Sequence, residues 1–211
     1  MPKQFLDLCG KTVLCHTLHA FREVIPQSHI VTVISRQMAD IWKEKCNRDG
    51  IKQGPIAFGG ETRWESVKNG LTALGHIDSN AIILVHDGVR PLVTPQFINE
   101  VVNSILSTDV DGVIPTIPLT DSIRHICDDG INSIPVDRTR FRAVQTPQAF
   151  RAGKLEKAFN LQYSPTFTDE ASMMAAAGFK NILLINGLEQ NIKITRPVDL
   201  IIAAHFLTSV D

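Results

Sequence analysis

The sequence lacks several features that define common classes of protein. Its four cysteines form no C-x-x-C pair and no Cys/His cluster, which argues against a zinc site and a disulfide scaffold. The net charge is −1, so the basic excess of most nucleic-acid-binding proteins is missing. No apolar run approaches the roughly 20 residues that span a bilayer, and the polar start is not a signal peptide. These absences predict a cytoplasmic protein with reduced thiols and with neither nucleic acid nor membrane as partner.

A dinucleotide-binding fingerprint is also missing. No G-x-G-x-x-G motif follows an apolar run, which weighs against a nicotinamide-dependent oxidoreductase. At 211 residues the chain is long enough for one α/β domain with a sizeable core, and we expect a single domain over residues 1–211. A small soluble substrate fits this composition best.

Apolar runs alternate with helical patterns along most of the chain, which predicts repeated βαβ units. The fold class we expect is therefore α/β, with a doubly wound, mostly parallel sheet. Helices are predicted over residues 11–22, 62–74 and 171–177, from Thr94-Pro95 onward and after Pro197. Strands are predicted over residues 29–35, 56–58, 81–86, 112–117, 143–145 and 181–185.

Residues 118–142 interrupt this alternation. Two short runs flank Asp129-Gly130, a dipeptide that favours a β-hairpin turn. A hairpin inserted into a doubly wound sheet has no obvious core to join, so it lies over the domain as a flap or packs against another subunit. We favour a protruding β-arm that forms a homodimer.

The most informative segment is the apolar run 81–86, which ends in His86-Asp87-Gly88-Val89-Arg90-Pro91. A continuous aliphatic run is typical of a strand that is buried on both faces of a sheet. Ligands of open α/β sheets bind outside the carboxyl ends of such strands. Asp87 and Arg90 therefore suggest a site for a cation or a phosphate, while the alternative is a turn with a solvated acid and arginine.

Four further clusters place polar groups at the ends of apolar segments. Taken singly, each has an ordinary explanation, because a lone lysine is usually solvated and Gly-Gly before a helix is usually a turn. Their order along the chain is more specific. They are Pro2-Lys3-Gln4-Phe5; residues 59–66, which read Gly-Gly-Glu-Thr-Arg-Trp-Glu-Ser; Val136-Asp137-Arg138 with Gln145-Thr146-Pro147-Gln148; and Thr168-Asp169-Glu170-Ala171-Ser172 with Asn191-Ile192-Lys193-Ile194-Thr195.

In this order the motifs resemble the cytidylyltransferase family that acts on 2-C-methyl-D-erythritol 4-phosphate in the non-mevalonate route to isoprenoids. The resemblance covers nearly the whole chain. Relatives that act on ribitol 5-phosphate share several motifs but differ around Val-Asp-Arg and Thr-Asp-Glu-Ala-Ser. The resemblance implies a Rossmann-like nucleotidyltransferase in which the sugar phosphate attacks the α-phosphorus of CTP and pyrophosphate leaves.

The resemblance also implies a role for particular residues in CTP binding and in catalysis. Lys3 and Lys193 match lysines that contact the triphosphate, and with Arg138 they are the predicted catalytic residues. Gly60, Glu61 and Ser66 match the part of the family that reads cytosine. For Ser66 the alternative is a hydroxyl that bonds to its own helix.

The remaining matched residues are implied to bind the acceptor. They are Asp87, Gly88, Arg90, Ser122, Arg138, Thr146 and Thr168, of which Ser122 and Arg138 would reach the sugar phosphate from the neighbouring subunit. Arg138 suits a phosphate because a guanidinium can bind it with two parallel hydrogen bonds, and its alternative is an ion pair with an acid of the arm. Mg²⁺ is the implied cofactor, bound mainly by the phosphates of CTP. Asp87 either binds the diol of the acceptor or lies near the metal.

The sequence departs from the family at its start, since it contains neither the first buried strand nor the glycine-rich loop that holds the CTP phosphates. We therefore expect an apolar slot between unpaired strands of the sheet. Two functional alternatives stay open: a ribitol-5-phosphate cytidylyltransferase, and an inactive dimeric protein that binds a nucleotide or a sugar phosphate.

Overall fold

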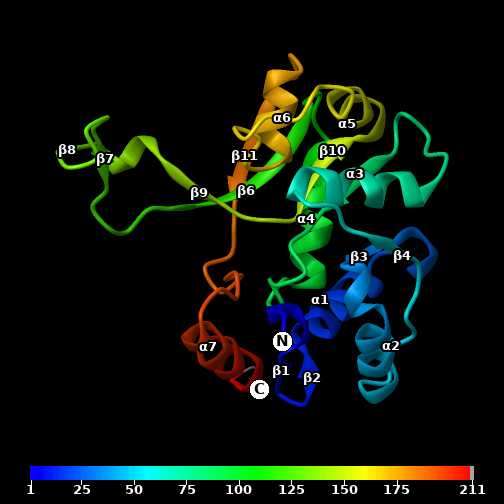
Figure 1. The fold of residues 1–211 in the computed structure, drawn as a ribbon. Helices are drawn as coiled ribbons and strands as arrows, with labels where there is room; N and C mark the ends of the chain where they lie inside the picture. The colour runs from blue at the N-terminus through cyan, green and yellow to red at the C-terminus, as the bar shows by residue number, and fades with distance from the viewer. Residues whose placement is uncertain (210–211) are drawn as a thin grey trace.

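The centre of the fold is a mixed five-stranded sheet. The computed structural model describes residues 1–209. The strands of this sheet are β5 (Ile82–Val85), β6 (Gly112–Pro118), β9 (Arg142–Val144), β10 (Gln148–Arg151) and β11 (Ile182–Asn186). Their order is β11-β6-β10-β5, with β9 also paired to β6 (Figure 1).

The expectation of a mostly parallel sheet is wrong. Strand β11 is parallel to β6, but β10 is antiparallel to both β5 and β6, and β9 is antiparallel to β6. The chain leaves β6 into the arm and returns directly through β9 and β10, with no crossover helix that would reverse its direction. Strand β10 was not predicted, and it is the strand that separates β5 from β6.

Helices cover both faces of this sheet, as a doubly wound fold requires. The helices are α1 (Val13–Arg22), α2 (Ala39–Arg48), α3 (Arg63–Leu74), α4 (Pro95–Leu106), α5 (Ala152–Ala158), α6 (Glu170–Ala176) and α7 (Pro197–Thr208). Along β6 and β10, neighbouring residues belong to different cores. Ile114 and Phe150 pack with α3, α5 and α6, whereas Val113 and Ala149 pack with α1 and α4.

Five of these helices match the predictions, and α2 and α5 were not predicted. Helix α2 buries only Trp42 and Cys46, so its apolar stripe is too short to show as a pattern, and α5 has seven residues. Within residues 1–209, no helix has the length and apolarity needed to cross a membrane.

The parallel strands β3 (Thr32–Ile34) and β4 (Ile56–Phe58) form a separate two-stranded sheet. Among the described residues no backbone ladder joins β3 or β4 to β5, so β5 is an edge strand of the main sheet. A short hairpin of β1 (Asp7–Leu8) and β2 (Lys11–Thr12) lies beside α7.

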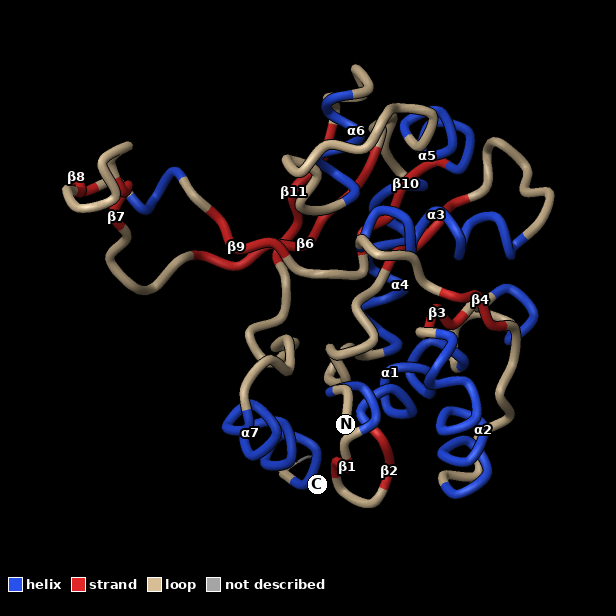
Figure 2. The backbone as a smooth tube through the Cα atoms, in the orientation of Figure 1, coloured by secondary structure: helices blue, strands red, loops and turns tan. Residues whose placement is uncertain are grey.

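Strands β7 (Arg124–Ile126) and β8 (Ser133–Pro135) form an antiparallel hairpin. Figure 2 shows this hairpin at the end of two extended segments of chain, away from the other sheets and the α-helices. Its apolar side chains Ile126, Ile131 and Ile134 are exposed. Residues 118–142 therefore bury little within one copy of the chain.

Candidate functional site

Three cations surround Asp87, which lies two residues after the end of β5. Its carboxylate lies 3.2 Å from Nζ of Lys193 and 3.2 Å from Nε of Arg90. A third cation, Nη2 of Arg63, lies 3.9 Å from Asp87 Oδ1. The structure thus brings together three segments that are far apart in sequence, at the carboxyl end of β5, an edge strand of the main sheet. We call Arg63, Asp87, Arg90, Glu170 and Lys193 the charged cluster.

The electrostatics of Asp87 follow from these neighbours. Burial alone would raise its pKa, but Lys193, Arg63 and Arg90 favour the carboxylate and lower the pKa below its usual value. Asp87 is therefore ionised at neutral pH. Burial raises the pKa of Glu170. Whether Glu170 is charged or neutral, the three cations of the cluster outnumber its carboxylates, and the excess positive charge suits an anionic ligand.

Arg63 connects the charged cluster to two helices. It is the first residue of α3, and its guanidinium makes two hydrogen bonds to the carboxylate of Glu170, the first residue of α6. Burial alone would lower the pKa of Arg63, but the carboxylate of Glu170 raises it. Glu170 itself is buried. A bidentate pair of this kind fixes the direction in which Arg63 faces Asp87.

The loop before α3 makes its hydrogen bonds internally. The amide of Gly60 donates to Oγ of Ser66 at 3.2 Å, and the amide of Glu61 donates to Oε2 of Glu65 at 2.7 Å. Ser66 in turn donates to the carbonyl of Thr62, which is the alternative considered for this hydroxyl. A Cβ at position 60 would lie 2.5 Å from Glu65, so the tight approach requires glycine.

The segment that carries Lys193 is fixed to the centre of the sheet by side chains. Gln145, which is buried, donates to the carbonyl of Leu188 at 2.8 Å and accepts from its amide at 3.1 Å. A Cβ at Gly187 would lie 2.5 Å from Oε1 of Gln145. Arg90 donates to the carbonyl of Asn191 at 2.9 Å. The contacts of Gln145 with Leu188 and of Arg90 with Asn191 therefore hold the loop that carries Lys193.

Thr146 was expected in the polar wall of the acceptor pocket, but only 4% of its surface is exposed. Its hydroxyl accepts from the amide of Asp87 at 3.1 Å and bonds to Nδ1 of His86 at 3.0 Å. Its carbonyl accepts from the side-chain amide of Asn191 at 2.8 Å. Thr146 thus lies behind Asp87, and both its hydroxyl and its carbonyl have hydrogen-bond partners within the protein.

Four further predicted site residues also lie outside the charged cluster. Lys3 is exposed in a short 3-10 helix, Lys3–Phe5, and Thr168 is exposed just before the first turn of α6. Ser122 and Arg138 are exposed at the base of the arm, where Arg138 donates to the carbonyl of Thr120. Within residues 1–209, none of the four forms an ion pair or hydrogen bond with a member of the cluster.

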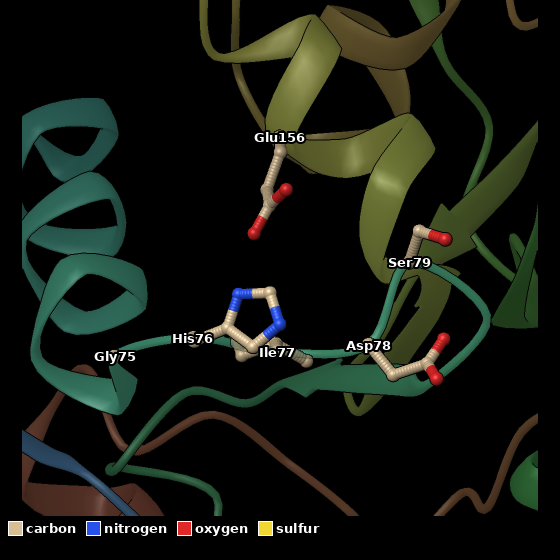
Figure 3. Close-up of a pocket in the computed structure, with 6 residues that line it drawn as sticks. All are labelled: Gly75, His76, Ile77, Asp78, Ser79 and Glu156. Atoms are coloured by element: carbon tan, nitrogen blue, oxygen red, sulfur yellow. The ribbon is translucent and has the colours of Figure 1, made fainter.

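Two open cavities lie away from the charged cluster. One, of about 460 Å³, is open to solvent between the loop after α3 and helix α5, with the ring of His76 and the carboxylate of Glu156 facing one another (Figure 3). None of the predicted site residues line it. The other, of about 200 Å³, lies at the base of the arm and is lined by Pro118, Leu119, Arg138, Thr139, Phe141 and Arg142.

Three residues of the site had no role in the sequence-based prediction: Arg63, His86 and Glu170. Each lies inside one of the motifs, so the signal was present in the sequence. What was missing was the contact between motifs, because residues 63 and 170 are separated by 107 positions. Only the fold shows that their side chains pair.

The family model described as 2-C-methyl-D-erythritol 4-phosphate cytidylyltransferase matches residues 1–209 of the chain. The chain belongs to this family. A relative of that name from Bacteroides thetaiotaomicron is 40% identical over 208 residues, which are 98% of this chain and 91% of the relative. One from Rubrobacter xylanophilus is 39% identical over 99% of the chain and 88% of its own length.

Solved structures of this family have the same fold. The 2-C-methyl-D-erythritol 4-phosphate cytidylyltransferase of Francisella tularensis superposes with a TM-score of 0.79 at 31% identity, over 96% of this chain and 92% of that one. The enzyme from Thermus thermophilus gives 0.76 at 27% identity, over 98% and 94%. The predicted family is therefore confirmed. The chain is a nucleotidyltransferase of isoprenoid biosynthesis that transfers a cytidylyl group to 2-C-methyl-D-erythritol 4-phosphate.

Proposed function

We propose that the charged cluster is where this cytidylyltransferase brings its two substrates together. The observation that carries the proposal is the excess positive charge around Asp87, formed by Lys193, Arg90 and Arg63 at the carboxyl end of β5. Both substrates are phosphate anions, and their mutual repulsion has to be offset before they can react. Fixed cations that need no rearrangement are the most effective means of doing so.

In the proposed reaction a phosphate oxygen of the acceptor attacks the α-phosphorus of CTP. The new P–O bond forms as the bond to the β-phosphate breaks, and pyrophosphate leaves with the electron pair. Lys193 and Lys3 neutralise charge on the triphosphate, and Asp87 and Arg90 bind the acceptor together with Gly88 and Thr168. A Cβ at Gly88 would lie 2.9 Å from Cδ1 of Leu14, so a larger residue here would displace that side chain.

The base of CTP is proposed to bind at the loop Gly60–Ser66. The amides of Gly60 and Glu61 are already bonded to side chains of α3, so the loop offers carbonyl oxygens and the Ser66 hydroxyl. Carbonyl oxygens suit the amino group of cytosine, which is a donor. Arg63 links this loop to Asp87, so the nucleotide and acceptor sides share one rigid support.

Mg²⁺ is the proposed cofactor, and the residues present fit an ion that arrives with CTP. Within residues 1–209, no three Asp, Glu, His or Cys side chains gather closely enough to hold a metal. Mg²⁺ retains waters and takes most other ligands from substrate phosphates, so the single carboxylate of Asp87 is sufficient. When bound, the ion neutralises charge on the phosphates during transfer.

Arg138 and Ser122 are proposed to reach the acceptor phosphate of a second copy through the arm 118–142. Both are exposed and, within residues 1–209, neither forms an ion pair or hydrogen bond with the charged cluster of its own chain. The arm also has exposed apolar side chains that a homodimer would bury. We further propose that residues 1–211, the last two outside the described residues, form one Rossmann-like domain. A cytoplasmic location agrees with four cysteines that are all unpaired.

The test is release of pyrophosphate from CTP and Mg²⁺ with each candidate acceptor. We expect turnover with 2-C-methyl-D-erythritol 4-phosphate to exceed turnover with ribitol 5-phosphate by more than tenfold in kcat/KM. A preference for ribitol 5-phosphate would overturn the substrate assignment. Calorimetric binding of the sugar phosphate without pyrophosphate release would favour the alternative of an inactive binding protein.

A further inference from the structure

A chain of hydrogen bonds links Asp87 and Arg90, the proposed acceptor residues of the charged cluster, through Thr146 and His86. The amide of Asp87 donates to Oγ1 of Thr146 at 3.1 Å, and the Thr146 hydroxyl lies 3.0 Å from Nδ1 of His86. On the other side of the ring, Nε2 of His86 lies 3.2 Å from the carbonyl of Arg90. The amide of Arg90 closes the turn by donating to the carbonyl of Asp87 at 3.0 Å.

The partners of His86 determine which nitrogen carries the hydrogen. A carbonyl oxygen can only accept, so Nε2 of His86 is protonated and donates to Arg90. Nδ1 then accepts the hydrogen of Thr146, whose oxygen is free to accept from Asp87. The ring packs against Phe21, with 4.9 Å between centroids, and burial lowers the pKa of His86 to about 4. A neutral imidazole is therefore held in one tautomer at neutral pH.

These bonds fix the backbone of the turn from which both acceptor residues project. The Asp87 amide and the Arg90 carbonyl are the two ends of this turn, and each is bound to one end of the His86–Thr146 pair. Shifts of about 1 Å in a substrate-binding group can lower the rate by a factor on the order of 100, so this turn has to be held closely. Neither His86 nor Thr146 has to touch the substrate for this purpose.

We propose that His86 and Thr146 are positioning residues that hold Asp87 and Arg90 in the geometry needed for the acceptor phosphate. This inference rests on the proposed acceptor site at the charged cluster. It replaces the direct role of Thr146 in the pocket wall. It also gives His86 a role that its place beside Asp87 in the sequence did not reveal.

The kinetic test compares Thr146→Val, which removes the hydroxyl, with Thr146→Ser, which retains it. We expect Thr146→Val to raise the KM for 2-C-methyl-D-erythritol 4-phosphate about tenfold and the KM for CTP less than twofold, because Asp87 and Arg90 serve the acceptor. Thr146→Ser restores both values. The matched control is Thr116→Val, another buried threonine whose hydroxyl donates to a backbone carbonyl, that of Ile185.

Two kinetic results would overturn the proposal. One is a Thr146→Val enzyme with an unchanged KM for the sugar phosphate. The other is an equal rise in both KM values, matched by Thr116→Val, since this would reflect a general loss of structure. Thermal unfolding of each variant shows whether the chain is folded at the assay temperature.

The second measurement does not depend on activity. Nitrogen-15 spectra of the histidine rings are recorded at pH 7, and the signals of His86 are assigned as those that disappear in His86→Gln. We expect these signals to show a neutral ring that is protonated at Nε2. Thr146→Val should shift its Nδ1 resonance. If this signature is present and the sugar phosphate still fails to bind or react, the hydrogen-bonded pair stands and the acceptor site is wrong. A charged ring, or the other tautomer, overturns the inference itself.

Discussion

The charged cluster and the base of the arm both present arginines to the proposed acceptor phosphate, but they differ in how those arginines are held. In the cluster, Arg63 and Arg90 each pair with carboxylates and also contact other segments of the chain. At the arm, Arg138 is exposed and its side chain bonds to the carbonyl of Thr120. Contacts within one copy of the chain therefore fix the arginines of the charged cluster, whereas Arg138 has few contacts that would fix its side chain.

This difference indicates how the site is divided. A cation that must offset charge at the reacting phosphorus needs a fixed position, and the cluster supplies it before any ligand arrives. An exposed arginine on an arm contributes only when another surface restricts it. We therefore expect loss of Lys193, the cluster's cation at the triphosphate, to affect the chemical step, and changes in the arm to affect the capture of the acceptor.

The largest expected effect in the cluster is that of Lys193→Ala. Loss of a fixed cation at the triphosphate should lower kcat by a factor of about 100 to 1000, with a smaller effect on stability, since Lys193 is largely exposed. Steady-state pyrophosphate release measures this. Lys154→Ala, which removes another lysine with an aspartate partner, Asp111, is the matched control. Near-normal turnover in Lys193→Ala would refute the assigned role.

At the arm, Arg138→Ala should raise the KM for the sugar phosphate by about 10- to 100-fold and leave the KM for CTP nearly unchanged. Arg140→Ala is the control, because Arg140 lies in the same short 3-10 helix, Arg138–Arg140. If both KM values rise equally, Arg138 does not bind the acceptor.

Mixing the Arg138→Ala and Lys193→Ala variants, with activity measured at a sugar-phosphate concentration below the wild-type KM, sharpens the comparison further. A heterodimer of Arg138→Ala and Lys193→Ala chains has one site with both residues intact, so a random mixture should recover roughly a quarter of wild-type activity. Recovery is measured after co-refolding or co-expression. No recovery, in a mixture that forms dimers by sedimentation, would show that the two residues act within one chain.

The support of the cluster is tested by Glu170→Ala. Removing a buried acid leaves Arg63 without its bidentate partner, and the free energy of unfolding should fall by about 2 kcal/mol, at the low end because Arg63 is partly exposed. The exposed acid Glu156 provides the control, with a change below about 0.5 kcal/mol for Glu156→Ala. Urea denaturation gives both values. Equal effects would mean that the pair contributes nothing specific.

The smallest expected effect is on acid stability. The pKa of Asp87 is lower in the folded protein than its usual value of 3.8, so its ionisation stabilises the fold above that pH. This contribution is lost as the pH falls through the lowered pKa. Between pH 5 and pH 3, unfolding free energies should therefore decline less steeply in Asp87→Asn than in the wild type. Identical slopes would contradict the lowered pKa.

Local patterns predicted much of the fold, and contacts between distant segments account for most of the misses. The capping residue Thr94 marked the start of α4 correctly, because an N-cap acts within a few residues of the chain. The cap of α6 is Asp169, one residue after the expected Thr168. Strand β10 was missed because Gln148–Arg151 has no apolar run of its own and becomes a strand by pairing with β5 and β6. The direction of β10 made the sheet mixed.

The sequence by itself determined the family and pointed to three of the five members of the charged cluster, because motifs depend on residue type and order along the chain. It placed Asp87, Arg90 and Lys193 in motifs without their distances. Only the tertiary structure decided that Arg63 and Glu170 pair, that Thr146 and His86 lie behind Asp87, and that Arg138 stands apart from them. Such contacts arise from packing between segments far apart in the chain, which no local pattern encodes.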